Sequence, residues 1–221
     1  MTEPTLKIEG VSIVIIGDFN PTIIQPLWLA NQGLISQEAA SPNIAKIGLI
    51  HRDITDFSID WLRLNIERNK FVATTEEESN YDSLRDLVKG IFQILRHTPV
   101  KQIGFNRFFH YKMPSEETFN RYGDCLAPKN PWKDLIKTPG LLDLTMMGER
   151  PDSYKGYLQV RTCVSPKINP HGILIHVNDH FELEDTNSIQ GCRELLEILE
   201  NIWEPSLQRA LPIATRLVNS A

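Results

Sequence analysis

The stretch GILIHVNDHF at residues 172–181 decides the fold class, and YLQVRTCV at residues 157–164 repeats its pattern shortly before it. In each stretch apolar and polar side chains alternate with period two, which is typical of a strand with one buried face. The aliphatic face of the later stretch is formed by Ile173, Ile175 and Val177. The opposite face carries His176, Asn178 and His180.

The same type of pattern extends toward the N-terminus. A strand over 141–147 precedes these two, and the short connections between the three predict antiparallel pairing. Further strands are predicted over 11–16, 44–50, 61–66 and 100–111. The run Val11–Ile16 is almost entirely aliphatic and is predicted to be the central strand.

Two long amphipathic helices complete the pattern. One begins near Ser79 and Asp82 and ends before Pro99, and the other follows residues 185–188. Their apolar positions are predicted to be buried: Leu84, Leu87, Val88, Ile91, Leu95, Leu195, Leu196, Leu199 and Ile202. The sequence therefore predicts one α+β domain over 1–221, with an antiparallel sheet of about six to seven strands and both helices on one face. Two successive strand–strand–strand–helix (βββα) blocks leave a duplication open as an alternative.

Shorter elements lie between them. A short helix is expected from Pro26 to Gly33, and another after Pro114. The Pro-rich region 125–139 is predicted to be a loop that Trp132 attaches to the core. Pro205 and Pro212 are expected to interrupt or kink the C-terminal helix.

Composition excludes several classes of protein. The 221 residues carry a formal net charge of −5, which argues against a protein that mainly neutralises nucleic-acid phosphates. Neither an apolar run long enough to span a bilayer nor a signal peptide is present in the sequence, so we expect a cytoplasmic protein with no membrane association. The three cysteines, at 125, 163 and 192, are far apart and match no disulfide, zinc or redox spacing.

The candidate site is the polar face of the predicted sheet. Six side chains fall opposite the aliphatic face and define it: Arg63, Glu67, Arg161, His176, Asn178 and His180. Such a face is either exposed to solvent, or it forms the floor of a ligand-binding site or a surface that binds a partner. The sequence alone does not choose among these three.

Metal and nucleophile chemistry are weaker interpretations. On a strand the Cα atoms of His176 and His180 lie roughly 13 Å apart, too far to share one zinc ion. Cys163 has no nucleophile motif around it, and no nucleotide-binding or metalloprotease motif occurs. We therefore expect neither a cofactor nor a metal. The basic and aromatic run over 106–112 would divide between two strand faces, so nucleic acid is not the expected partner.

Three stretches resemble a family of uncharacterised bacterial proteins of similar length. They comprise Gly17–Pro21 with Gln25–Trp28, Leu95–Pro99 with Ile103–Asn106, and Tyr154–Arg161. The resemblance implies a bacterial cytosolic origin, and it supplies no activity, cofactor or catalytic residue.

Two classes of function remain. The first is a non-catalytic protein-interaction subunit or binding module of a bacterial cytosolic assembly, either bound to a partner protein or as a homo-oligomer. A bacterial antiviral defence system is one possible setting for it. The apolar residues of segment 205–218 would form its interface if they are not packed on their own domain. The second class is a small-molecule enzyme whose site lies on the polar sheet face.

Overall fold

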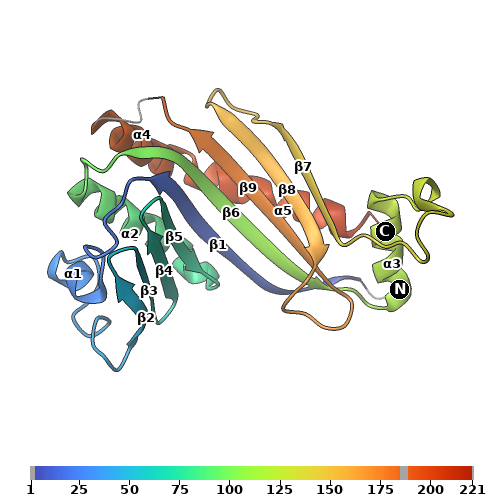
Figure 1. The fold of residues 1–221 in the computed structure, drawn as a ribbon, viewed down its shortest axis with the longest axis horizontal. Coiled ribbons are helices and arrows are strands. Elements are labelled where there is room, and N and C mark those ends of the chain that lie inside the picture. The colour runs from blue at the N-terminus through green and yellow to red at the C-terminus, as the bar shows by residue number, and fades with distance from the viewer. Residues whose placement is uncertain (1–2, 185–188, 221) are drawn as a thin grey trace.

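The computed structural model describes residues 3–184 and 189–220, and in them the strands form one antiparallel sheet (Figure 1). Its nine strands are β1 (Thr5–Gly17), β2 (Ala45–His51), β3 (Ile54–Ile59), β4 (Leu62–Glu67), β5 (Lys70–Thr75), β6 (Val100–Lys112), β7 (Asp143–Glu149), β8 (Gly156–Val164) and β9 (Gly172–Glu182). Their spatial order is β2-β3-β4-β5-β1-β6-β9-β8-β7.

Five α-helices occur in the described residues: α1 (Pro26–Asn31), α2 (Tyr81–Ile94), α3 (Glu116–Leu126), α4 (Ile189–Asn201) and α5 (Trp203–Val218). Figure 1 shows α4 and α5 behind the strands, and α5 packs on β6 and β9. Helix α3 lies at one end of the sheet near both chain termini. One face of the sheet is therefore covered by helices, and we call the other the helix-free face.

The α+β class and antiparallel pairing are confirmed, but the expected strand number is wrong. The sequence reading missed β3 and β5, because each places a threonine at a buried position and so weakens the aliphatic signal. Thr55 is fully buried because its hydroxyl donates to the Pro21 carbonyl at 2.9 Å. Two-residue turns join β3 to β4 and β4 to β5, and Asp60 in the first adopts a positive φ of 46°.

The helix predictions also need correction, since there are four helices of seven or more residues rather than two. Pro205 is tolerated because the first turn of a helix has no intrahelical use for its N–H, and α5 continues through Pro212. Segment 205–218 packs on its own sheet, so it forms no broad exposed patch; among its aliphatic residues only Leu211 is exposed. Trp132 is 47% exposed and is not buried in the core.

Most of the predicted core positions of α2 and α4 are buried. Those confirmed as buried are Leu84, Leu87, Val88, Ile91, Leu195 and Leu199. The remaining three are half-buried: Leu95, Leu196 and Ile202. All three lie beside the main core cluster and contact it from its border.

The chain order repeats itself around the centre of the sheet. Each half begins with a 13-residue strand, β1 or β6, and these two strands pair with each other. In each half a helix follows, then a meander whose last strand pairs with the first strand of that half, then another helix. The two halves are thus related topologically by an approximate twofold axis between β1 and β6.

The buried side chains form two apolar clusters with charged residues between them. Phe105 and Phe181 belong to the larger cluster, whereas Phe109 and Val177 belong to the smaller one. Charged side chains interrupt the helix-covered face at this boundary, and we call them the ionic belt: Glu9, Arg107, Arg150, Asp152, Asp179 and Arg209. Buried charges require partners, and every member of this belt has at least one.

Candidate functional site

The helix-free face carries a row of polar side chains that crosses the sheet. At matching register positions from β4 to β8 the residues are Arg63, Thr74, Ser12, Asn106, Asn178 and Gln159. A neighbouring row places Arg161 directly opposite His176. The predicted polar face therefore exists as one continuous surface.

The predicted site residues nevertheless divide into two groups. Arg161, His176, Asn178 and His180 lie on the adjacent strands β8 and β9. Arg63 lies on β4, four strands away from β9, which is roughly 19 Å at the usual strand spacing. Glu67 is at the exposed end of β4. One small ligand could not contact both groups at once.

The two histidines of this face are held by neighbouring side chains. His176 Nε2 donates to Asn106 Oδ1 at 2.9 Å, and the ring of His180 stacks on Tyr157 with centroids 4.4 Å apart. Burial lowers the pKa of both imidazoles. Both are therefore neutral near pH 7 and suit hydrogen bonding rather than anion binding.

The β8–β9 connection closes one end of the helix-free face. Ser165 Oγ lies 2.8 Å from Nδ1 of the buried His110 and accepts from the backbone of the connection. Lys167 in the same connection pairs with Glu76, which follows β5, and lies over the Phe108 ring. The connection thus extends from β8 across the face toward the first half of the sheet.

Metal-ligating and nucleophilic groups do not gather on this face. Within residues 3–184 and 189–220, no three His, Cys, Asp or Glu side chains are arranged to hold a metal ion. Cys163 lies between Asp143 and Leu174 on the neighbouring strands, and burial raises the pKa of its thiol. It therefore stays protonated and lacks a cross-strand histidine to activate it.

Sequence reasoning missed the buried centre of this surface. Asn106 and Tyr157 contact the two histidines, yet neither was among the candidates. Successive side chains of a strand point to opposite faces, and Asn106 directly follows the core residue Phe105. The sequence therefore did indicate that Asn106 points to the polar face. The opposition of Arg161 to His176 depends on strand register, for which the sequence contains no direct signal.

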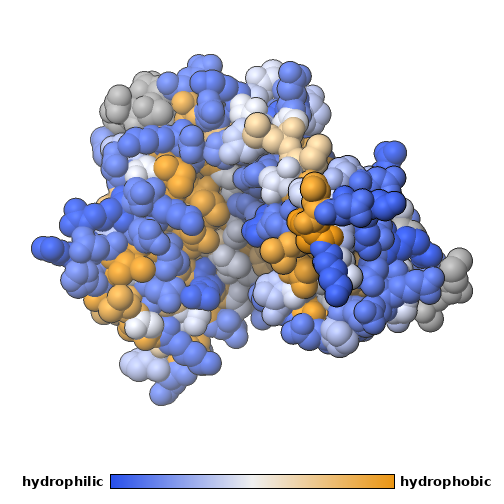
Figure 2. Space-filling model, turned by 45° about the vertical axis from the view of Figure 1, so that its right-hand side comes forward, coloured by the Kyte–Doolittle hydropathy of each residue, from blue (hydrophilic) through white to orange (hydrophobic). Residues whose placement is uncertain are grey.

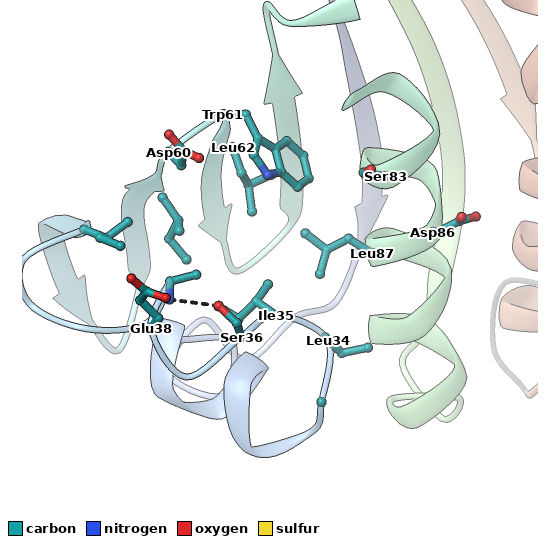
Figure 3. A pocket seen from close by; sticks show the side chains of 14 residues that line it. Leu34, Ile35, Ser36, Glu38, Asp60, Trp61, Leu62, Ser83, Asp86 and Leu87 are labelled. Carbon is teal, nitrogen blue, oxygen red and sulfur yellow. Dashed lines mark hydrogen bonds between the residues drawn. The ribbon is translucent and has the colours of Figure 1, made fainter. Parts of the chain in front are cut away.

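A wide cleft lies at the other end of the molecule, between the α1–β2 loop, the β3–β4 turn and α2 (Figure 3). Its volume is about 600 Å³. In Figure 3 Trp61 and Leu62 face the loop residues Ile35 and Ser36, and Leu87 closes the side. Among its lining residues that the structure describes, three are acidic and none is basic, so the cleft disfavours anions.

The two edge strands of the sheet differ in how they are protected. Strand β2 carries Lys46, and a bulge at Gly48 shifts its register against β3. Charged side chains and bulges are the usual devices that prevent an edge from pairing with another chain. The apolar side chains of Ile47 and Leu49 on β2 are exposed, but they lie on an edge that these devices protect.

Strand β7 has no bulge, and it carries charged side chains only at its two ends, Asp143 and Glu149. It pairs regularly with β8 along its whole length, and no Lys, Arg or Pro occurs between Asp143 and Glu149. Three apolar side chains on or beside it are 63–75% exposed, and we call them the β7 edge patch: Leu142, Met146 and Met147. Figure 2, which brings the side with β7 forward, shows an apolar band on the right-hand half of the molecule.

Comparisons of the sequence with known families and curated proteins give no relative on which to rest a function. No protein-family model and no curated protein sequence matched the chain. In the described residues, no helix combines the length and the apolar character that crossing a bilayer requires.

Proposed function

We propose that this protein is a protein-interaction subunit that binds a strand of its partner along the free edge of β7. One observation carries the proposal: the edge is regular, exposes apolar side chains at its centre, and has no bulge, lysine or proline to block pairing. In an antiparallel ladder every second residue of an edge strand directs its N–H and C=O outward. An added strand would satisfy these groups.

The side chains of the β7 edge patch would supply apolar binding energy. Full burial of a Leu or Met side chain contributes about 1.5–3 kcal/mol, and these three are already about one-third covered. Their burial would therefore stabilise a complex by roughly 4 kcal/mol before the main-chain hydrogen bonds are counted. Met146 and Met147 are adjacent and therefore point to opposite faces of β7, and both are exposed, so both faces are accessible at this point of the strand.

Charge favours a different polypeptide over a second copy of this chain. Full antiparallel pairing of β7 with itself would place Asp143 opposite Glu149, and like charges directly opposite destabilise a strand pair. Asp143 already binds Arg161 of its own sheet. The matching partner is an extended segment with alternating apolar side chains and a basic residue opposite Glu149. A bacterial cytosolic assembly is the setting that we propose for such a subunit.

The test combines affinity capture from the native host with hydrogen exchange on the recovered complex. We expect a partner whose binding slows exchange of the amides of 143–149. Met147→Lys places a charge on the β7 edge and should abolish capture. The matched control is Ile47→Lys on β2, an edge residue of similar exposure at 57%, which should leave capture unchanged.

Three results would overturn the proposal. One is a captured protein that is retained by Met147→Lys, and another is a partner that protects a different surface. The third is light scattering that shows a dimer of this chain with protected β7 amides, because the occupant would then be a second copy.

A further inference from the structure

A second cleft lies on the helix-covered side, between the start of α2 and the middle of α5, above β1 and β6. Its volume is about 490 Å³. The floor is formed by Glu9, Arg107 and Tyr81, and the walls by Leu207, Leu211 and Pro212 of α5. It is separate from the polar row and from the β7 edge patch.

Arg107 at the floor is a buried cation with unused donors. Its Nη2 donates to Glu9 Oε2 at 2.6 Å, and its guanidinium lies 4.9 Å from the centroids of both the Tyr81 and Phe109 rings. The residue is only 7% exposed, and its Nε is buried without a hydrogen-bond partner in the residues that the structure describes. An arginine has five N–H donors, so most of its capacity is unused.

Tyr81 adds a second donor of the same kind. The residue is 6% exposed, and its hydroxyl is likewise buried without a partner in the described part of the chain. Burial raises the pKa of this phenol to about 12, so the hydroxyl keeps its proton at physiological pH. Most buried polar groups are paired, and two unpaired donors beneath one cleft indicate an acceptor supplied from outside the chain.

The rim of the cleft is acidic. Asp82 is paired with Arg85 at 3.1 Å, whereas Glu78 and Glu204 form no ion pair within residues 3–184 and 189–220. Together with Glu9 the cleft has four carboxylates against one guanidinium. The electrostatic field at its mouth therefore favours a cation, although the floor requires an acceptor.

We propose that this cleft binds a compound with a free ammonium group next to a carbonyl group. The carbonyl oxygen accepts from Arg107 and Tyr81, and the ammonium pairs with Glu204 and Glu78. A branched apolar side chain packs on Leu207 and Leu211. Amino-acid amides and the free N-terminus of a peptide share this chemistry.

The test is calorimetric titration of the full chain with matched probes. L-leucinamide carries all three features, isopentylamine lacks the carbonyl, and 4-methylpentanamide lacks the ammonium. We expect leucinamide to bind at least about tenfold more tightly than either, the effect of one lost charge-assisted hydrogen bond. A Leu-Gly-Gly peptide with a free or an acetylated N-terminus separates the two sources: tighter binding of the free peptide than of leucinamide would identify a peptide terminus.

Variants locate the binding. Tyr81→Phe and Glu204→Gln should each weaken leucinamide binding about tenfold, whereas Tyr122→Phe and Glu197→Gln should not change it. Tyr122 is a buried tyrosine whose hydroxyl is already paired, and Glu197 is an exposed glutamate on α4. The proposal is wrong if leucinamide binds no better than the two incomplete probes. It is equally wrong if leucinamide binding survives in both cleft variants.

Discussion

Deleting one hydroxyl from each of two buried tyrosines should change the stability of this protein in opposite directions. Tyr81 and Tyr122 are 6% and 3% exposed, and burial raises the pKa of each phenol to about 12. Tyr122 Oη lies 2.7 Å from Oγ1 of the buried Thr162, while Tyr81 Oη has no partner in the described residues. The same substitution, Tyr→Phe, therefore removes a satisfied group in one case and an unsatisfied group in the other.

The magnitude follows from the cost of burying an unpaired polar group. Tyr122→Phe loses its hydrogen bond and leaves Thr162 Oγ1 unpaired, which should lower the free energy of unfolding by about 1–3 kcal/mol. Tyr81→Phe removes a desolvated hydroxyl with no compensating bond, and should raise the free energy of unfolding by about 1 kcal/mol. The two variants should therefore differ by roughly 3 kcal/mol.

Urea unfolding followed by circular dichroism measures this difference. With an m-value of about 2–3 kcal/mol/M for a chain of this size, the midpoints of the two variants should lie about 1 M urea apart on opposite sides of the wild type. If Tyr81→Phe is destabilised as much as Tyr122→Phe, the Tyr81 hydroxyl has a partner and the reasoning fails. A stabilised Tyr81→Phe that also loses leucinamide binding would mean that the hydroxyl is kept for binding at the expense of stability.

Three further outcomes are expected. Burial lowers the pKa of His176 in the folded state, so the unfolded state protonates this histidine more readily. The free energy of unfolding should therefore fall as the pH drops below about 6.5. His176→Gln should make this fall less steep in urea unfolding measured between pH 7 and 5. Gly10→Ala should cost about 2 kcal/mol, since its Cβ would lie 2.3 Å from Phe108 Cζ, whereas Gly148→Ala meets nothing within 4 Å and should change stability by less than about 0.5 kcal/mol. Asp179→Asn should cost about 3–5 kcal/mol in thermal or urea unfolding, because it weakens the pairing of two arginines in the ionic belt.

The sequence predicted those elements whose periodicity is strong. The alternation of β8 and β9 and the apolar spacing of α2 were sufficient to give the α+β class and the antiparallel pairing. Strand β3 was missed because Thr55 is buried through a hydrogen bond to Pro21, a contact 34 residues away in the chain. Local pattern cannot show a polar residue that becomes a core residue only through a distant partner.

The candidate site was predictable only as a face. Because side chains alternate between the two faces of a strand, His176 and Asn178 were expected on the same face of β9, and the structure places them there. Which strands lie beside β9 depends on topology, and this is why Arg63 was grouped with residues roughly 19 Å away. The contact of Asn106 with His176 arises from the pairing of β6 with β9, which joins residues 70 positions apart.

Two features of this protein break the rules that otherwise describe its sequence well. The β7 edge exposes Met146 and Met147 at a centre that carries no charge, and the cleft above Arg107 and Tyr81 buries donors without acceptors. Neither feature is offset by other contacts within the folded chain. The exposed edge lowers its solubility, and the unpaired buried donors lower its stability. Such violations are expected where a sequence is selected for binding as well as for folding. Because the β7 edge patch lies at an edge of the sheet and the cleft lies above β1 and β6 near its centre, each can be removed without disturbing the other. Met147→Lys should therefore leave leucinamide binding intact, and Tyr81→Phe should leave partner capture intact.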